Sequence, residues 1–280
     1  MTDILDSTAS GSMRGAVSTL FPATLGRFET PEDRALIDGL SRWVETHFRE
    51  QLAQRPSCHV YIETLPAEIV ALVDRLRDSP VIHDLIVRQV PAGSGFEPMK
   101  HTDELYISHY NKDRGGDQGL FDRHYDGNLR FLSSSMVVRA LIYLQSDASY
   151  KVVFGDSRVE KAFTTYEFGL LDFHRELHWV EGSYTPGAPQ RILLKCNYLV
   201  TVPGAGARGR FALAANTAVF YVVKAAMEYS KSPRTPAQKV VGHLCNLFRR
   251  LNIVHPLVPF AAIAATAIAA AVAVSAVVNL

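Results

Sequence analysis

Cysteine and net charge are both scarce in this chain. Its 280 residues hold three widely spaced cysteines, Cys58, Cys196 and Cys245, so no disulfide framework or cysteine-based zinc site is indicated. A formal net charge of +1 gives no global attraction to nucleic acid, and none is expected as a partner. Residues 1–29 show little periodicity and no apolar core after a basic start, so we expect a flexible N-terminus without a secretory signal. The lack of a disulfide framework favours a reducing compartment.

Long apolar runs are also rare, and the clearest one lies at the C-terminus. Leu257–Val278 is uncharged and long enough to span a bilayer. Arg249 and Arg250 precede it and almost nothing follows it, so the positive-inside rule leaves the rest of the chain in the cytosol. We expect a transmembrane tail anchor over residues 256–280. The alternative is a soluble intracellular protein in which this segment packs against another apolar helix.

Residues 206–255 predict C-terminal helices. Phe211–Tyr229 reads as an apolar helix, and two prolines separate it from an amphipathic stretch, Ala237–Asn252. The second helix carries basic residues away from its apolar side, which favours a membrane surface. Packing against the preceding domain is equally compatible with the pattern.

Two helices are expected in the N-terminal part of the chain. Thr30 and Pro31 form a good helix start, and that helix should run to about Gln54. A second helix is predicted over Pro66–Arg77, which has an apolar stripe. We expect both to support a domain rather than to carry its site.

Strands dominate the middle of the chain. The expected strands are Glu104–Tyr110, Ser135–Leu144, Tyr150–Phe154, Thr164–Phe173 and Gln190–Val200. His124 and Asp126 precede the second of these, and His178 follows the fourth. Two imidazoles and one carboxylate can occupy one face of an Fe(II) ion, so these three residues are the candidate metal ligands.

Arg191 on the last strand is the candidate for holding an organic acid. A guanidinium binds carboxylate in a bidentate fork, which suits the far carboxylate of 2-oxoglutarate. Lys195 lies on the same face of that strand, because side chains repeat every second residue, and it is the alternative anchor.

Other assignments of these residues remain open from the sequence. His101-Thr102-Asp103 repeats the His-x-Asp spacing but precedes the first strand, so we rank it second. His174 and His178 could form a zinc pair on a helix, although the intervening Glu is misplaced for that motif. Each ligand taken singly has an ordinary structural explanation. Their combination and order favour the set containing His124.

This order of motifs resembles the 2-oxoglutarate/Fe(II)-dependent dioxygenase superfamily, and its prolyl 4-hydroxylase-like branch most closely, over residues 85–202. The resemblance implies an α+β fold, with a double-stranded β-helix (jelly-roll, cupin-like) core at residues 30–205 buttressed by the N-terminal helices. It implies Fe(II) held by His124, Asp126 and His178, with 2-oxoglutarate and O2 as cosubstrates. No Ser or Thr stands two residues after Arg191, so Tyr110 is the candidate hydroxyl partner of the cosubstrate.

The resemblance implies an oxygenase that hydroxylates an unactivated C–H bond of a small molecule, or desaturates or cyclises it, releasing succinate and CO2. Because Asp126 is present, halogenation is not implied. Two alternatives remain: a hydroxylase of protein side chains of the prolyl type, and a non-catalytic cupin-like binding protein at a membrane. The sequence names neither the substrate nor the oligomeric state.

Overall fold

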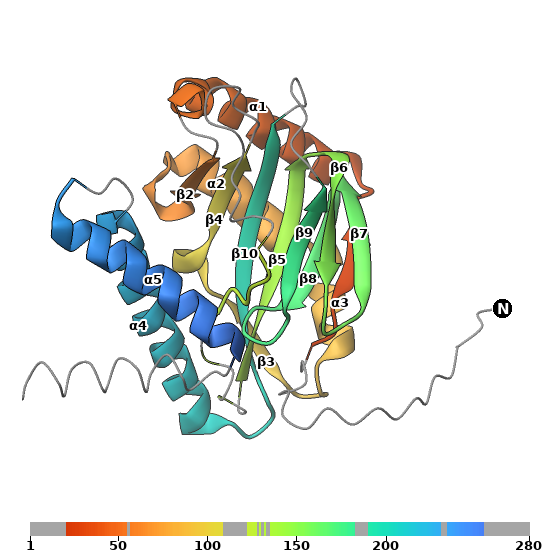
Figure 1. Cartoon of the computed structure of the whole chain (residues 1–280). Coiled ribbons are helices and arrows are strands. Elements are labelled where there is room, and N and C mark those ends of the chain that lie inside the picture. Colours follow the sequence, from red (N-terminus) through yellow and green to blue (C-terminus); the bar gives the residue numbers. More distant parts are fainter. Residues whose placement is uncertain are drawn as a thin grey trace, which may run out of the picture.

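The computed structural model describes residues 21–54, 57–108, 122–127, 129, 132, 135–182, 190–230 and 234–254. Two antiparallel sheets lie at its centre, with helices around them (Figure 1). The α+β class expected from the sequence is confirmed. The helices are α1 (Pro31–Gln54), α2 (Ala67–Arg77), α3 (Pro80–Gln89), α4 (Gly206–Ser230) and α5 (Pro236–Val254), with short 3-10 turns η1 (Ile62–Thr64) and η2 (Lys100–Thr102).

The larger sheet has seven strands in the order β1-β8-β5-β10-β4-β2, with β3 also paired to β10. Its strands are β1 (Thr24–Arg27), β2 (Ser57–Tyr61), β3 (Gly95–Pro98), β4 (Glu104–Ser108), β5 (Ser135–Gln145), β8 (Glu167–Asp172) and β10 (Arg191–Thr201). The smaller sheet has the order β7-β6-β9, from β6 (Asp147–Phe154), β7 (Val159–Thr164) and β9 (His178–Gly182). The long apolar strands β5 and β10 lie side by side in the larger sheet.

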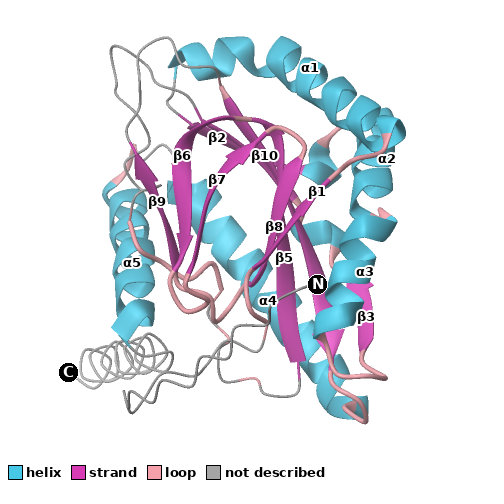
Figure 2. Cartoon of the chain, turned by 90° about the vertical axis from the view of Figure 1, so that its right-hand side faces the viewer, coloured by secondary structure: helices cyan, strands magenta, loops and turns pink. Residues whose placement is uncertain are grey.

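Alternation along these strands divides the apolar residues between two cores. On one face of the larger sheet, Val138, Ile142 and Leu194 pack with Ile37 and Val73 of α1 and α2. On the other face, a second buried cluster joins the two sheets. Figure 2 shows the smaller sheet facing the larger one, with α1, α2 and α3 on the opposite side. The residues that alternate with the helix-facing core therefore point into the space between the sheets.

Most of the expected elements are present. Thr30 caps α1, because its Oγ1 accepts the Asp33 N–H at 3.1 Å. The strand expected over Thr164–Phe173 is interrupted: β7 ends at Thr164 and β8 begins at Glu167 after a tight turn. His178 follows β8, as expected, and is itself the first residue of a further strand, β9.

One expected boundary was wrong. Thr24–Arg27, within the segment expected to be a flexible N-terminus, form strand β1, which pairs with β8. This short strand shows only a weak alternating pattern, and its pairing with a distant strand holds it in place. Residues 1–20 and the expected tail anchor at residues 256–280 lie outside the described residues, so the anchor stays a prediction.

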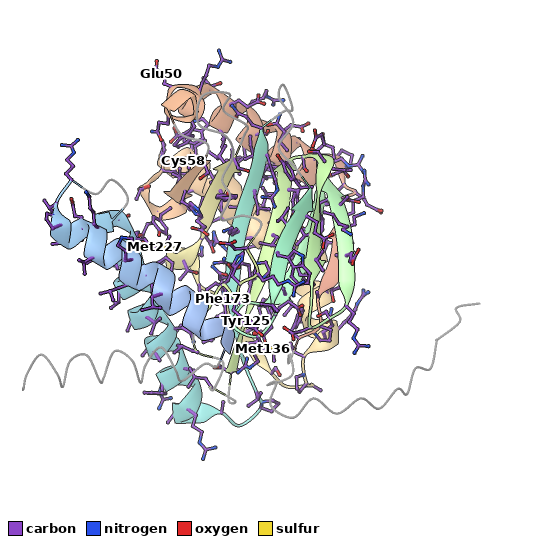
Figure 3. All side chains as sticks on the ribbon, viewed as in Figure 1. Glu50, Cys58, Tyr125, Met136, Phe173 and Met227 are labelled. Carbon is purple, nitrogen blue, oxygen red and sulfur yellow. The ribbon has the colours of Figure 1, made fainter. Side chains whose placement is uncertain are left out.

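The two C-terminal helices form as expected and lie on one flank of the molecule, the side on which Met227 is labelled (Figures 1 and 3). In the described part of the chain, Gly206–Tyr229 of α4 is the one helix long and apolar enough to cross a membrane, with a mean hydropathy of 1.2. Length and composition alone make this weak evidence for a span.

Candidate functional site

The site begins with a short backbone pairing between segments far apart in sequence. His124 and His178 form an isolated antiparallel bridge, in which each N–H donates to the other's carbonyl at 3.0 Å. Asp126 follows two residues after His124, and the intervening residue lets its side chain return to the same side. The bridge brings a histidine from a loop next to a histidine from β9, at the edge of the space between the sheets.

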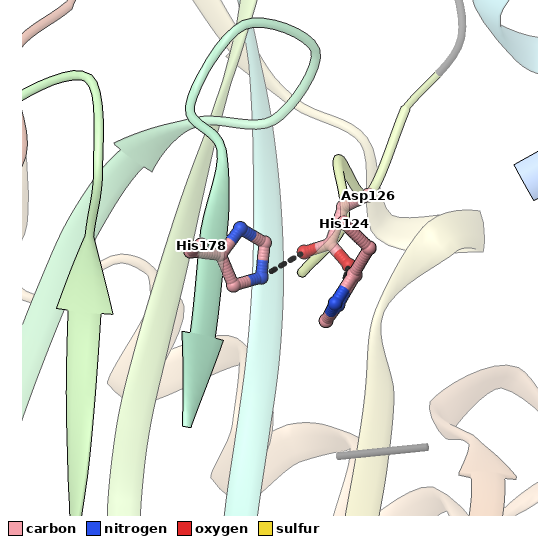
Figure 4. A group of neighbouring side chains, drawn as sticks. All are labelled: His124, Asp126 and His178. Carbon is pink, nitrogen blue, oxygen red and sulfur yellow. Dashed lines mark ion pairs between the residues drawn. The ribbon is translucent and has the colours of Figure 1, made fainter. Parts of the chain in front are cut away.

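The side chains of these three residues converge (Figure 4). One ligand atom of each lies within 4.8 Å of the others. The two oxygens of Asp126 face different histidines: Oδ1 is 3.6 Å from Nε2 of His124, and Oδ2 is 3.6 Å from Nε2 of His178. The candidate ligands named from the sequence are therefore brought together.

Backbone carbonyls fix the orientation of both imidazole rings. Nδ1 of His124 lies 2.7 Å from the carbonyl of Asp122, and Nδ1 of His178 lies 3.1 Å from the carbonyl of Glu176. A carbonyl only accepts, so each Nδ1 carries the proton and donates it. The lone pair is then on Nε2, the nitrogen that faces Asp126. Hydrogen bonds of this kind orient histidine ligands in metal sites.

Arg139 of β5 supports the carboxylate of the site. Its Nη1 donates to Oδ2 of Asp126 at 2.8 Å, and its Nε donates to Oδ1 of Asn197 at 2.9 Å. Its guanidinium also stacks on the Phe173 ring, 4.3 Å from the centroid. Burial by itself raises the pKa of Asp126, but the charge of Arg139, joined by that of His178 once this imidazole is protonated at low pH, outweighs it and holds that pKa well below its usual range.

The electrostatics suit a cation. Burial lowers the pKa of His178 to about 4, so this imidazole is neutral at pH 7 while Asp126 is ionised. Neutral imidazoles and a carboxylate are the forms that bind a divalent metal. The residues present therefore fit a divalent ion with two nitrogen ligands and one oxygen ligand, a donor set typical of non-haem Fe(II).

Arg191 begins β10 and is buried. A register shift in the β5–β10 pairing falls between Ile192 and Leu193, directly beside it, and such bulges re-aim neighbouring side chains. Its Nη2 donates to the Tyr143 hydroxyl at 3.2 Å, and its guanidinium stands 5.3 Å from the Tyr143 ring centroid. Tyr143, Leu193 and Phe154 belong to the cluster between the sheets, and the Phe154 ring lies 6.5 Å from that of His178.

A hydroxyl that the sequence did not single out lies opposite Arg191. Ser108 of β4 is its register partner, and paired residues of antiparallel strands project to the same face. Ser108 Oγ is buried and has no hydrogen-bond partner among the described residues. The one indication in the sequence is that Ser108 stands two residues after Tyr106 and therefore lies on the same face of β4. Tyr110, the hydroxyl expected from the sequence, lies outside the described residues.

Lys195 is already paired in the structure. Its Nζ donates to Oε1 of Glu104 at 2.9 Å and lies 5.1 Å from the Tyr106 ring centroid. Burial raises the pKa of Glu104, but Lys195 and His59 outweigh this and hold that pKa well below its usual range. An ammonium held by an ionised carboxylate is a weaker candidate than Arg191 for binding a second acid.

The competing motif, His101-Thr102-Asp103, has structural contacts. Asp103 is buried, where its Oδ2 accepts from Nε of Arg77 at 2.8 Å and its Oδ1 accepts the Asn197 N–H at 3.1 Å. His101 stacks on Tyr221 of α4, with ring centroids 5.7 Å apart. The two side chains of this triplet therefore have different partners.

His174 is also structural. Its Nδ1 accepts the Leu129 N–H at 3.2 Å, so Nε2 carries the proton and donates to Oδ1 of Asn216 in α4 at 2.6 Å. Residues 173–175 form a turn, not a helix, so His174 and His178 do not share a helix face. The zinc-pair alternative is not supported by this arrangement.

Comparisons with known proteins found similarity in structure only. No family model and no curated protein matches the chain. Among solved structures, the chain is similar to SnoN, a non-haem α-ketoglutarate-dependent epimerase from nogalamycin biosynthesis, at 14% identity over 65% of this chain and 82% of that one, with a TM-score of 0.46. It is similar to HygX from Streptomyces hygroscopicus, solved with nickel and 2-oxoglutarate, at 15% identity over 66% and 83%, with a TM-score of 0.38. A collagen prolyl hydroxylase of Paramecium bursaria Chlorella virus-1 matches at 8% identity over 64% and 96%, with a TM-score of 0.36.

Proposed function

We propose that the protein is a non-haem Fe(II), 2-oxoglutarate-dependent oxygenase whose metal is held by His124, Asp126 and His178. The observation that carries this is the convergence of three ligand atoms within 4.8 Å, with both imidazoles turned by backbone hydrogen bonds so that Nε2 faces inward. When bound, iron with 2-oxoglutarate and O2 supplies the oxidation of a C–H bond, with succinate and CO2 as co-products. We also propose that the two facing antiparallel sheets form the double-stranded β-helix core of such enzymes.

The protein's own residues hold the candidate metal ligands in position and balance the charge of Asp126. Arg139 donates to Oδ2 of Asp126, which orients this carboxylate and helps to keep it ionised, the form that would hold the metal. The backbone carbonyls behind His124 and His178 keep the protons on Nδ1. Among the described residues these contacts preorganise three ligands, a set that would leave a bound Fe(II) able to take a cosubstrate.

For the cosubstrate, we assign the far carboxylate of 2-oxoglutarate to Arg191, with Ser108 and Tyr143 supplying hydroxyls. Support comes from the burial of Arg191, from its contact with the Tyr143 hydroxyl, and from the unpartnered Ser108 Oγ in register with it. A buried guanidinium binds a carboxylate more strongly than an exposed one, because less water competes for it. Lys195 stays with Glu104 in this assignment.

We favour hydroxylation of a small molecule over modification of a protein side chain. Support comes from burial: His178 and Arg191 are buried, and His124 and Asp126 are only partly exposed. A protein loop needs more open access than these residues indicate. Desaturation and ring closure depend on how the substrate lies and are alternatives within the same class.

The test is anaerobic addition of Fe(II) and 2-oxoglutarate to the full-length protein, followed by its visible spectrum. We expect a weak metal-to-ligand charge-transfer band that is absent in His178→Ala. Arg191→Ala should raise the 2-oxoglutarate concentration needed to develop the band, whereas Lys195→Ala should leave it nearly unchanged.

The opposite results are equally informative. Folded protein that gives no band and binds no Fe(II) would favour the non-catalytic binding protein and refute the proposal. A band that needs more 2-oxoglutarate in Lys195→Ala than in Arg191→Ala would keep the metal site but move the anchor to Lys195. Succinate release without added substrate, measured in air, gives an independent readout of the intact centre.

A further inference from the structure

Exposed apolar side chains gather on the two C-terminal helices. Ten large apolar side chains are exposed among the described residues, and eight of them belong to α4 and α5. These eight are Phe211, Tyr221, Val222, Met227, Tyr229, Val240, Leu244 and Leu247. Scattered apolar residues on a surface are ordinary, but a concentration on one helical pair marks a contact surface.

Helical spacing orders most of these residues into two stripes. On α4, Phe211, Val222 and Tyr229 are eleven and seven residues apart, close to whole numbers of turns, so they share one side. On α5, Val240, Leu244 and Leu247 follow the i, i+4, i+7 pattern. We call these six residues the α4–α5 face. Val222, at 70% exposure, is the most exposed of them.

The opposite side of α4 is fixed to the domain by polar contacts. Asn216 accepts from buried His174 at 2.6 Å, and Lys224 donates to Glu63 at 2.6 Å and lies 3.8 Å from the Tyr61 ring centroid. A helix that crossed a bilayer would have to leave these partners. The contacts therefore favour an orientation in which α4 stays on the domain with its Phe211–Val222–Tyr229 stripe turned outward.

Charge on this segment is one-sided. Residues 206–254 hold eight of the 29 basic residues of the chain but only one of its 28 acidic residues, Glu228. The rest of the chain holds 21 basic and 27 acidic residues. The basic residues are Arg208, Arg210, Lys224, Lys231, Arg234, Lys239, Arg249 and Arg250. Of these, Arg208, Arg210, Arg234 and Lys239 are exposed. Apolar stripes accompanied by exposed cations complement a surface that is apolar inside and anionic outside.

We propose that the α4–α5 face docks on an anionic lipid bilayer, with both helices lying in the interface rather than crossing it. Apolar side chains enter the acyl boundary, and the neighbouring cations contact phosphate headgroups. A protein partner would also cover apolar stripes, but the excess of seven positive charges on one segment favours an extended anionic surface over a compact apolar one. This inference is independent of the proposed oxygenase activity.

The test uses the full-length protein with one labelling site at a time. Cys58 and Cys196 are buried, so Cys245→Ser leaves a background for single cysteines at exposed positions. An environment-sensitive dye is attached at Val222→Cys or at Leu247→Cys. Val87→Cys on α3, where the native side chain is 56% exposed, is the matched control away from the proposed face.

The labelled proteins are mixed with vesicles of phosphatidylcholine alone or with phosphatidylserine added. We expect a blue shift and quenching by nitroxide lipids at positions 222 and 247 with the anionic vesicles, and neither at position 87. Raising the salt concentration should weaken this binding. Arg234→Gln and Lys239→Gln should each lower vesicle affinity by about fivefold.

Three results would overturn the proposal. Vesicle binding with the dye at positions 222 and 247 still in water would mean that another segment, such as the expected tail anchor, holds the chain. Equal binding to both vesicle types at all salt concentrations would refute the role of the cations. A blue shift that needs no lipid and grows with protein concentration would assign the face to contact between two copies of the chain.

Discussion

Two His-x-Asp triplets with the same spacing, His124-Tyr125-Asp126 and His101-Thr102-Asp103, have different surroundings in this molecule. Each aspartate accepts a hydrogen bond of 2.8 Å from a buried arginine. Arg139 donates to Asp126, and Arg77 donates to Asp103. They differ in the second oxygen. Oδ1 of Asp126 faces an imidazole, whereas Oδ1 of Asp103 accepts a backbone N–H. The comparison teaches that the His-x-Asp spacing allows ligand atoms to converge, and that the remaining partners of the carboxylate decide whether they do.

The two triplets are also connected. Asn197 donates its backbone N–H to Asp103 and accepts from Nε of Arg139, which in turn holds Asp126. The side-chain amide of Asn197 donates to the carbonyl and hydroxyl of Thr102 at 3.2 and 2.9 Å. The His101 triplet therefore helps to hold in place the arginine behind the His124 triplet.

Removing a ligand gives the largest expected difference between the triplets. Asp126→Ala removes the anionic ligand, so Fe(II) affinity should fall by more than the roughly 10–100-fold expected for losing a supporting residue. His101→Ala should leave Fe(II) affinity unchanged, because that ring stacks on Tyr221 away from the site. Anaerobic titration with Fe(II) measures both. Equal losses in the two variants would contradict the choice of the His124 triplet, and a larger loss in His101→Ala would reverse it.

The second expected effect is on stability. Asp103→Ala leaves the guanidinium of Arg77 buried without its main partner, which should lower the free energy of unfolding by about 3–5 kcal/mol. Urea unfolding of the metal-free protein measures it. Replacing both residues, as Asp103→Ala with Arg77→Met, should recover part of the loss. A double variant no more stable than the single one would mean that the pair is not the source of the effect.

Arg139 gives an intermediate effect. Arg139→Gln removes the charge that holds Oδ2 of Asp126, so Fe(II) affinity should fall by about 10–100-fold while both imidazoles stay in place. The same titration measures it. Arg88→Gln, which alters an exposed arginine on α3, is the matched control. Unchanged affinity in Arg139→Gln would show that Asp126 needs no support.

The smallest effect expected concerns pH. Burial lowers the folded-state pKa of His174 to about 3, below its unfolded value of about 6.5. The unfolded chain therefore binds more protons between these values, so stability is full above pH 6.5 and falls as the pH decreases toward 3. Between pH 7 and pH 5, the titration of His174 alone should lower the free energy of unfolding by about 2 kcal/mol.

Urea unfolding at the two pH values measures this loss, and His174→Gln is the comparison. The glutamine does not titrate in this range, so the pH dependence should become shallower by that amount. An unchanged slope in His174→Gln would assign the acid sensitivity to other groups.

Much of the site could be predicted from the sequence because its ligands carry distinctive chemistry. His124, Asp126 and His178 were identified from residue type and order, and the structure brings them together. Arg139 and Ser108 were not identified as site residues. Arginine and serine are common on strands, and nothing local distinguishes one that faces a metal ligand or a buried guanidinium. Their roles follow from register, which pairs Arg139 with Asn197 and Ser108 with Arg191.

The sequence by itself determined the α+β class, the amphipathic helices and the strands β5 and β10, because periodicity and capping are local properties of the chain. It also limited the metal ligands to a few candidates. The order of motifs ranked the His124 triplet first, but only the tertiary structure shows, among the described residues, that a second imidazole converges on Asp126. That choice depends on which distant strand supplies the second imidazole and which backbone groups satisfy each carboxylate, and no local pattern contains this information. The same holds for α4, whose apolar composition permits a membrane span while its contacts with His174 and Glu63 hold it on the domain.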